Sequence, residues 1–143
     1  MLTRLNVTSI YVLDKDEALD FYVNKLGLEK GSDFKQGDYR WLTVRVPGNT
    51  DVEISLEQPG PPLHDEGTAE QLRELIAKGA LGGLVFHTDD ARALYETLKA
   101  RGVTDFTQEP MDHFYGVDMG IRDPFGNAIR ILQPKRVAQE ANA

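Results

Sequence analysis

The chain has 143 residues, a length typical of one domain, and its content of apolar and charged residues, 41% and 27%, is ordinary for a globular protein. The formal net charge is -7 and the basic residues are scattered, so the composition argues against a nucleic-acid partner. The absence of cysteine excludes disulfides, thiolate metal sites and a thiol nucleophile. No run approaches the roughly 18 apolar residues that a membrane span needs, so we expect a cytoplasmic protein without membrane contact.

The first half of the chain predicts a strand, a helix and three further strands. Residues 5–12 alternate as a strand does, and the residues from Asp14 to Asp16 can cap the helix that follows. Apolar residues then recur at helical spacing until Gly27, which is a typical helix stop. Three short alternating segments complete this half, and the last of them is VPGNTDVEISLEQP.

The connection over residues 59–82 begins with the Pro- and Gly-rich stretch QPGPPLHDEGT. Its composition predicts a loop, in which His64 is expected to be exposed. An amphipathic pattern over residues 68–78 then predicts an extra helix, with Thr68 or Glu70 as its N-cap.

The second half repeats the first at an offset of 75 positions, which places Asp14 on Asp89 and Gly27 on Gly102. A strand over 83–88 is followed by a helix capped by Asp90, and the last strand again leaves a turn, in RDPFGNAIRILQP. We therefore predict an α+β fold of two βαβββ modules, residues 5–58 and 83–134, whose curled mixed sheets enclose a pocket. Residues 1–134 are expected to form a single domain, and 135–143 a flexible tail.

Alternation along the strands predicts one apolar face and one polar face for each sheet. Leu42, Val44, Val46, Val52, Ile54, Leu56, Ile129 and Ile131 are expected to pack against the helices. The opposite faces have two interpretations, because an antiparallel sheet often shows its second face to water, whereas two curled sheets would line a cavity. Under the second interpretation the candidate ligand-binding residues on the strands are Val7, Ser9, Tyr11, Trp41, Glu53, Ser55, His87 and Arg130.

The segment MDHFYG supplies three further candidates, His113, Phe114 and Tyr115. We expect it to be a loop that overhangs the mouth of the pocket, where the aromatic rings stack on a ligand; alternatively, Phe114 packs into the core. His87 has a similar pair of interpretations, as a base or hydrogen-bonding group of the pocket, or as a structural histidine.

The segments IYVLDKDEALDFYVNKLGLE, VFHTDDARALYETLKARGV, FTQEP and IRDPFGNAIRILQ resemble the vicinal oxygen chelate superfamily, which includes glyoxalase I, the bleomycin-resistance proteins and extradiol dioxygenases. The resemblance covers residues 5–134 and is closest to the bleomycin-resistance-like branch. It implies a homodimer, and in the metal-using members four strand positions that hold a divalent ion. Carried over by spacing, those positions are Val7, Glu53, Gly83 and Arg130.

Only Glu53 among these four has a side chain that ligates metals, so we expect no metal and no cofactor. Glu53 and Arg130 could instead form an ion pair in place of the metal, or both could be solvated at the rim.

Three functions remain open from the sequence. The first is a non-catalytic protein that sequesters an aromatic natural product or drug-like ligand, as the bleomycin-resistance relatives do. The second is an enzyme, either a lyase, isomerase or dioxygenase with relocated metal ligands, or a metal-free catalyst with His87, Glu53 or Glu57 as the base. The third is a metabolite-sensing module that acts on a partner protein. No catalytic residue is assigned.

Overall fold

The computed structural model describes residues 1–135, which form two compact units with one four-stranded mixed sheet each. Unit one comprises residues 1–82 and 124–127, and unit two residues 83–123 together with the strand that begins at residue 128. The predicted α+β fold of two βαβββ modules is confirmed. Apart from residue 135, the expected tail lies outside the described residues.

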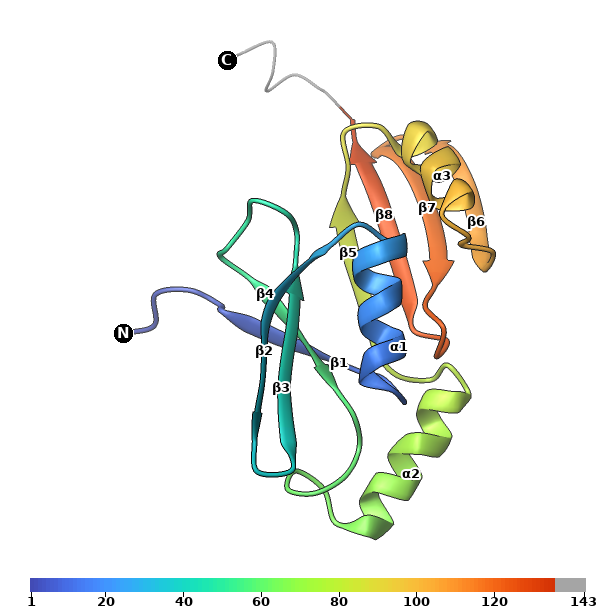
Figure 1. The fold of residues 1–143 in the computed structure, drawn as a ribbon. Helices are drawn as coiled ribbons and strands as arrows, with labels where there is room; N and C mark the ends of the chain where they lie inside the picture. Colours follow the sequence, from blue (N-terminus) through green and yellow to red (C-terminus); the bar gives the residue numbers. More distant parts are fainter. Residues whose placement is uncertain (136–143) are drawn as a thin grey trace. The chain divides into compact units, whose positions relative to one another are not determined.

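Unit one carries its strands in the order β1-β4-β3-β2 (Figure 1). Its elements are β1 (Val7–Tyr11), α1 (Lys15–Leu19), the π-helix η1 (Asp20–Lys25), β2 (Glu29–Gln36), β3 (Tyr39–Arg45), β4 (Glu53–Glu57) and α2 (Glu66–Ala77). Unit two has the order β5-β8-β7-β6, with β5 (Gly83–His87), α3 (Ala91–Ala100), β6 (Phe106–His113), β7 (Gly116–Arg122) and β8 (Ala128–Pro134).

In each unit the first strand pairs in parallel with the last. Val7 is opposite Glu53 and Tyr11 is opposite Glu57 in unit one, whereas Gly83 is opposite Ala128 in unit two. A parallel pair needs a crossover, which in each unit consists of the helix and the next two strands. The remaining strands pair antiparallel, as hairpins do.

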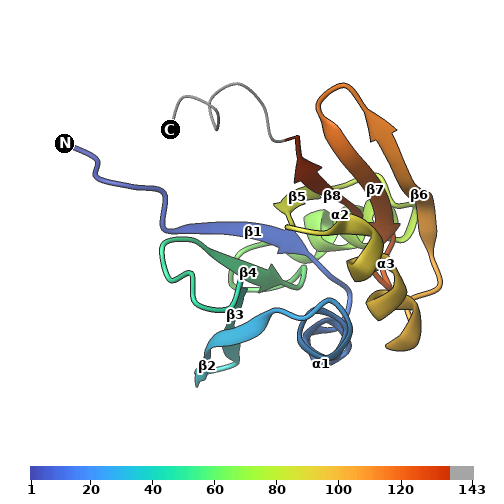
Figure 2. The same ribbon diagram turned by 90° about the horizontal axis from the view of Figure 1, so that it is seen from above.

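The inward faces of both sheets are apolar, as the alternation predicts. α3 covers one face of the strands β6, β7 and β8 (Figure 2). The prediction was wrong for Val46 and Val52, because both lie just beyond the end of a strand and are exposed. The buried apolar residues on the strands are Ile10, Leu42, Val44, Ile54 and Leu56 in unit one, and Met119, Ile121, Ile129 and Ile131 in unit two.

The helix of unit one contains one residue more than its counterpart. Asp14 and Asp90 are the two N-caps, and Gly27 follows the first by 13 positions whereas Gly102 follows the second by 12. The extra residue is absorbed in the π-helix η1, where the Leu26 N–H donates to the carbonyl of Phe21, five residues back. The offset of 75 that aligns the two glycines therefore misplaces the cap by one residue, onto Asp89.

The helix α2 begins two residues earlier than the sequence predicts. Its N-cap is Asp65, whose side chain accepts a hydrogen bond from the Thr68 N–H at 2.7 Å. The prediction of Thr68 or Glu70 as the cap was wrong, because Asp65 accepts from the N3 position and Thr68 is that donor. None of the helices in residues 1–135 is long and apolar enough to cross a membrane.

The caps can be tested with two adjacent aspartates of equal charge. Asp90→Ala should cost about 1 kcal/mol of unfolding free energy, because the Ala93 N–H loses its acceptor. Asp89→Ala removes the same charge from an exposed position and should stay within about 0.5 kcal/mol of wild type. Urea unfolding of the three proteins measures both values, and a larger loss at Asp89 would contradict this assignment of the cap.

Candidate functional site

Six of the predicted site residues share one face of the unit-one sheet, which we call the unit-one polar face. Register places Val7 beside Glu53, Ser9 beside Ser55 and Tyr11 beside Glu57. Thr43 is opposite Ser55, so Trp41, two residues earlier, follows the same face, and Phe34 is its partner on β2. The structure therefore brings together Val7, Ser9, Tyr11, Trp41, Glu53 and Ser55, with Phe34, Thr43, Arg45 and Glu57 added.

Glu57, the last residue of β4, is only 6% exposed, so the solvated interpretation does not describe it. Its Oε1 accepts hydrogen bonds from the Tyr39 hydroxyl at 2.7 Å and from the Ser55 hydroxyl at 2.5 Å. Its Oε2 is buried and has no hydrogen-bond partner among the described residues. A buried acceptor without a donor is costly, so this oxygen favours a donor from a ligand or from water.

Tyr39 is fixed as a donor toward Glu57. Burial and the hydrogen bond to Glu57 raise the pKa of Tyr39 to about 12, so its hydroxyl keeps the proton throughout the physiological range. Tyr39 is not among the site residues predicted from the sequence, although its position on β3, two residues from Trp41, places it on the same face.

Glu53 is held by neighbours on both of its oxygens. The Thr43 hydroxyl donates to Oε1 at 2.6 Å, and Arg45 Nη1 donates to Oε2 at 3.2 Å. Arg45 also bonds Glu29 through Nε, and this bond is the main reason why the pKa of Glu29 lies below its ordinary value. Gly31 leaves the space for this cluster, since a Cβ there would lie 2.5 Å from the Thr43 hydroxyl oxygen.

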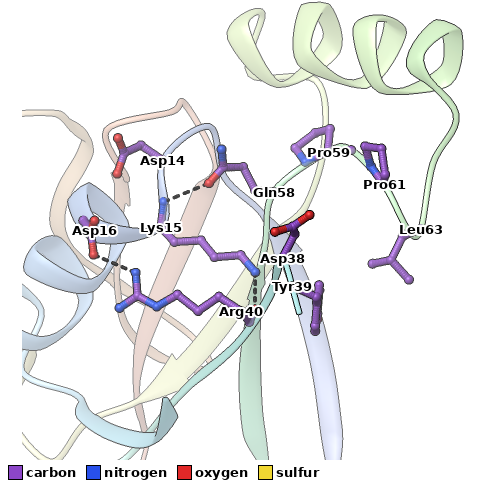
Figure 3. Close-up of a pocket in the computed structure, with 11 residues that line it drawn as sticks. Asp14, Lys15, Asp16, Asp38, Tyr39, Arg40, Gln58, Pro59, Pro61 and Leu63 are labelled. Carbon is purple, nitrogen blue, oxygen red and sulfur yellow. Dashed lines mark hydrogen bonds and ion pairs between the residues drawn. The ribbon is translucent and has the colours of Figure 1, made fainter. Parts of the chain in front are cut away.

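A polar pocket of about 370 Å³ adjoins Tyr39 (Figure 3). Lys15 extends along it, donates from Nζ to the carbonyl of Arg40 at 2.5 Å and lies 4.7 Å from the centre of the Tyr39 ring. Burial lowers the pKa of Lys15, against the opposing effect of Glu57. The pocket is lined by Asp14, Lys15, Asp16, Asp38, Tyr39, Arg40, Gln58, Pro59, Gly60, Pro61 and Leu63. Most of these residues lie in loops and turns, for which strand alternation gives no signal.

His64 is half-buried, so the expectation of an exposed residue was wrong. Its ring contacts that of Tyr11 at a centroid distance of 5.7 Å, and its Nε2 lies 3.4 Å from the Tyr11 hydroxyl. Its Nδ1 accepts a hydrogen bond from the Gly60 N–H. The loop therefore folds back onto Tyr11 and restricts the orientation of that ring.

In unit two, Asp118 joins two of the predicted site residues. Arg130 Nη2 forms an ion pair with Asp118 Oδ2 and donates to the side-chain oxygen of Gln108 at 3.2 Å. The Tyr115 hydroxyl donates to the same Asp118 oxygen at 3.0 Å. Asp118 is only 8% exposed. It is not among the site residues predicted from the sequence, because a single acidic residue in a strand gives no indication of its partners.

The aromatic residues of MDHFYG lie around the turn between β6 and β7. His113, the last residue of β6, stacks on Tyr115 with a centroid distance of 4.9 Å and an angle of 3° between the rings. Its Nε2 is buried and has no hydrogen-bond partner in residues 1–135. Phe114 is 88% exposed, so the alternative that it packs into the core is wrong.

The remaining candidates of unit two follow the strands β5 and β8. Val85 is opposite Arg130 and His87 is opposite Leu132. Both Val85 and His87 are exposed, so neither is held in the core of this unit. We call the surface formed by Val85, His87, Gln108, Asp118, Gly120, Arg130 and Leu132 the unit-two polar face.

The positions that hold metal in the family do not fit a metal ion here. Val7 and Gly83 offer no lone pair, Arg130 is a cation, and both oxygens of Glu53 already accept hydrogen bonds. The two pairs of positions also differ in register. In unit one Val7 is opposite Glu53, whereas in unit two Arg130 is opposite Val85 rather than Gly83. Within residues 1–135 no three His, Asp or Glu side chains are close enough together to hold a metal.

Glu53 and Arg130 belong to different units, and each has an oppositely charged partner inside its own unit. Neither charge therefore needs the other as its counter-ion. Their pairing in place of the metal stays a prediction.

A double-mutant cycle tests the hydrogen bond between Tyr39 and Glu57. Tyr39→Phe should cost about 1 kcal/mol of unfolding free energy in the wild-type background, because it removes one donor from a buried carboxylate. In the Glu57→Ala background the same change should cost less, because the bond is already lost. Urea unfolding of the four proteins measures the coupling. Tyr95→Phe is the control, because it removes a hydroxyl bonded to Glu109 and should cost the same with and without Glu57. Equal losses from Tyr39→Phe in both backgrounds would contradict the contact.

Comparison with known proteins places the chain in a family. A family model described as Glyoxalase/Bleomycin resistance protein/Dioxygenase superfamily matches residues 4–131. The uncharacterized protein YurT of Bacillus subtilis (strain 168) is 35% identical over 130 residues, which cover 91% of this chain and 98% of that protein.

Two solved structures are similar over nearly their whole length. The crystal structure of UcmS2 has 43% sequence identity and a TM-score of 0.86, and the match covers 92% of this chain and 98% of that one. TnmS3, described as an antibiotic binding protein from Streptomyces sp. CB03234, has 29% identity and a TM-score of 0.74, with 94% and 98% covered. The chain therefore belongs to the glyoxalase/bleomycin resistance protein/dioxygenase superfamily.

Proposed function

We propose that the protein binds a small, partly aromatic molecule and sequesters it without chemical conversion. The observation that carries this proposal is the row formed by Tyr11, Glu57, Trp41 and Phe34 across the unit-one polar face. Aromatic side chains flank a buried carboxylate that has one oxygen without a donor. Apolar walls with a few placed polar groups are the usual composition of a small-molecule site.

The relatives support the same class of function. TnmS3 is described as an antibiotic binding protein, and its likeness to this chain extends over 94% of the sequence. A role in resistance to an aromatic natural product follows for this protein as a proposal. We further propose that it acts as a cytoplasmic homodimer, and that its site residues include those predicted from the sequence.

The emission of Trp41 should report binding. Trp41 is the only tryptophan and belongs to the aromatic row, so a planar ligand that stacks there should quench its fluorescence. We expect saturable quenching with some members of a panel of polycyclic aromatics bearing hydroxyl, carbonyl or carboxylate groups. Trp41→Ala should weaken their binding, measured by calorimetry, about 2- to 10-fold, since stacking contributes roughly 0.5–1.5 kcal/mol.

Trp41→Phe is the matched variant, because it keeps an aromatic ring at that position and should retain most of the affinity. Ligands that bind tightly yet leave the emission unchanged would place the site away from Trp41. A panel from which nothing binds, or in which bound compounds emerge chemically altered, would overturn the proposed function.

We also expect binding to be independent of metal. Addition of Zn²⁺, Ni²⁺, Fe²⁺ or Mn²⁺ to dialysed protein should leave both the melting temperature and the ligand Kd unchanged, because specific binding of a metal to the folded state would raise its stability. About one equivalent of metal per chain after dialysis, by elemental analysis, would contradict the expectation.

A further inference from the structure

We propose that the unit-two polar face binds an aromatic molecule and that Arg130 recognises an acceptor oxygen of it there, in a carbonyl or a carboxylate group. This inference rests on the proposed function, the binding of a small and partly aromatic molecule, and names a chemical group that such a molecule carries. The evidence for it lies on the unit-two polar face, where the guanidinium of Arg130 is held in place and has N–H donors without an acceptor among the described residues.

Arg130 uses only part of its hydrogen-bonding capacity within its unit. A guanidinium has five N–H donors, and the bonds to Asp118 and Gln108 both come from Nη2. Among the described residues, Nε and Nη1 of Arg130 have no acceptor. The side chain is 37% exposed, so these remaining donors can be reached.

The guanidinium is held in place before any ligand arrives. Asp118 is buried, and the Tyr115 hydroxyl bonds the same carboxylate oxygen that pairs with Arg130. Gln108 holds the other N–H of Nη2. A donor fixed by such bonds loses little conformational entropy on binding, which favours affinity.

Apolar side chains lie beside the polar partners of Arg130, and two of them are exposed. Val85, its neighbour in register on β5, is 70% exposed, and Met111, opposite Asp118 on β6, is exposed as well. Leu132 is the next residue along β8 with the same orientation. A hydrogen bond beside apolar surface is less screened by water, so a planar ligand with one acceptor oxygen matches this face better than a fully polar one.

Gly120 provides the room beside the free donor. A Cβ at this position would lie 2.5 Å from Arg130 Nη1 and would also contact the Thr107 hydroxyl. Both atoms are ends of flexible side chains, so Gly120→Ala should displace the guanidinium while it leaves the net charge of the chain unchanged. This variant separates the position of Arg130 from its charge.

The test compares two probes of nearly equal shape, 2-acetylnaphthalene and 2-ethylnaphthalene, which differ in the carbonyl oxygen. Dissociation constants from NMR titration of the full chain should favour the acetyl compound about 3- to 10-fold in the wild type, as expected for one net hydrogen bond. Naphthalene-2-carboxylate, compared with the acetyl compound, shows whether a charged or a neutral oxygen is preferred. Arg130→Gln and Gly120→Ala should both bring the acetyl-to-ethyl ratio close to one.

Gly67→Ala is the matched control, because its Cβ would meet only an Asp65 oxygen at 3.6 Å in the first turn of α2, and it should keep the wild-type ratio. If neither probe binds the wild type, the proposed function fails. Two results would overturn the inference without contradicting the proposed function. One is equal affinity of the wild type for the acetyl and ethyl probes, and the other is a preference for the acetyl probe that remains in Arg130→Gln. Sedimentation of Val85→Glu tests whether the unit-two polar face instead binds a second copy of the chain. If this variant is a monomer where the wild type is a dimer, and if both probe affinities are unchanged, the inference is overturned.

Discussion

The parallel pairing of the first and last strands is the constraint on which each unit depends. It brings Val7 beside Glu53 in unit one and Gly83 beside Ala128 in unit two, although these residues are far apart in the sequence. Because side chains alternate between the faces of a strand, a slip of one residue would turn Glu57 toward the core and Leu56 toward the unit-one polar face. The capped helix is the first part of the connection between these strands, and in unit one the π-helix takes up the one residue by which its helix is longer.

Each of the two polar faces has a buried carboxylate, Glu57 in unit one and Asp118 in unit two, and the two are stabilised in related ways. Glu57 accepts from the Tyr39 hydroxyl and Asp118 from the Tyr115 hydroxyl, and burial raises the pKa of both tyrosines. They differ in the cation, since Arg130 pairs directly with Asp118 whereas Lys15 bonds a carbonyl near Glu57. Unit one therefore offers an unused acceptor and unit two an unused donor, each within its own sheet.

Alternation and the repeat were sufficient to predict the modules and the polar face that carries Tyr11, Trp41, Glu53 and Ser55. They could not predict that Glu57 is buried, because burial depends on Tyr39, Ser55 and a loop that returns over the strand end. Asp118 was missed for the same reason, since its role is defined by Arg130 and Tyr115 rather than by its own position. Thr68 was mistaken for a cap because a cap and its N3 donor are both polar residues near a helix start.

The bonding of Glu53 and Asp118 favours binding over proton transfer, whereas Glu57 keeps one oxygen without a hydrogen-bond partner among the described residues. A general base needs an oxygen or nitrogen that is free to reach the substrate's proton. Glu53 has both oxygens occupied, and Asp118 is tied to Arg130 and Tyr115, so on each face at least one carboxylate is committed to the fold. Groups held in this way orient a ligand at little entropic cost, because their positions are already fixed. The residues at the family's metal positions also favour binding. Val7, Gly83 and Arg130 cannot ligate a metal that would act as a Lewis acid, and Arg130 offers a hydrogen-bond donor instead.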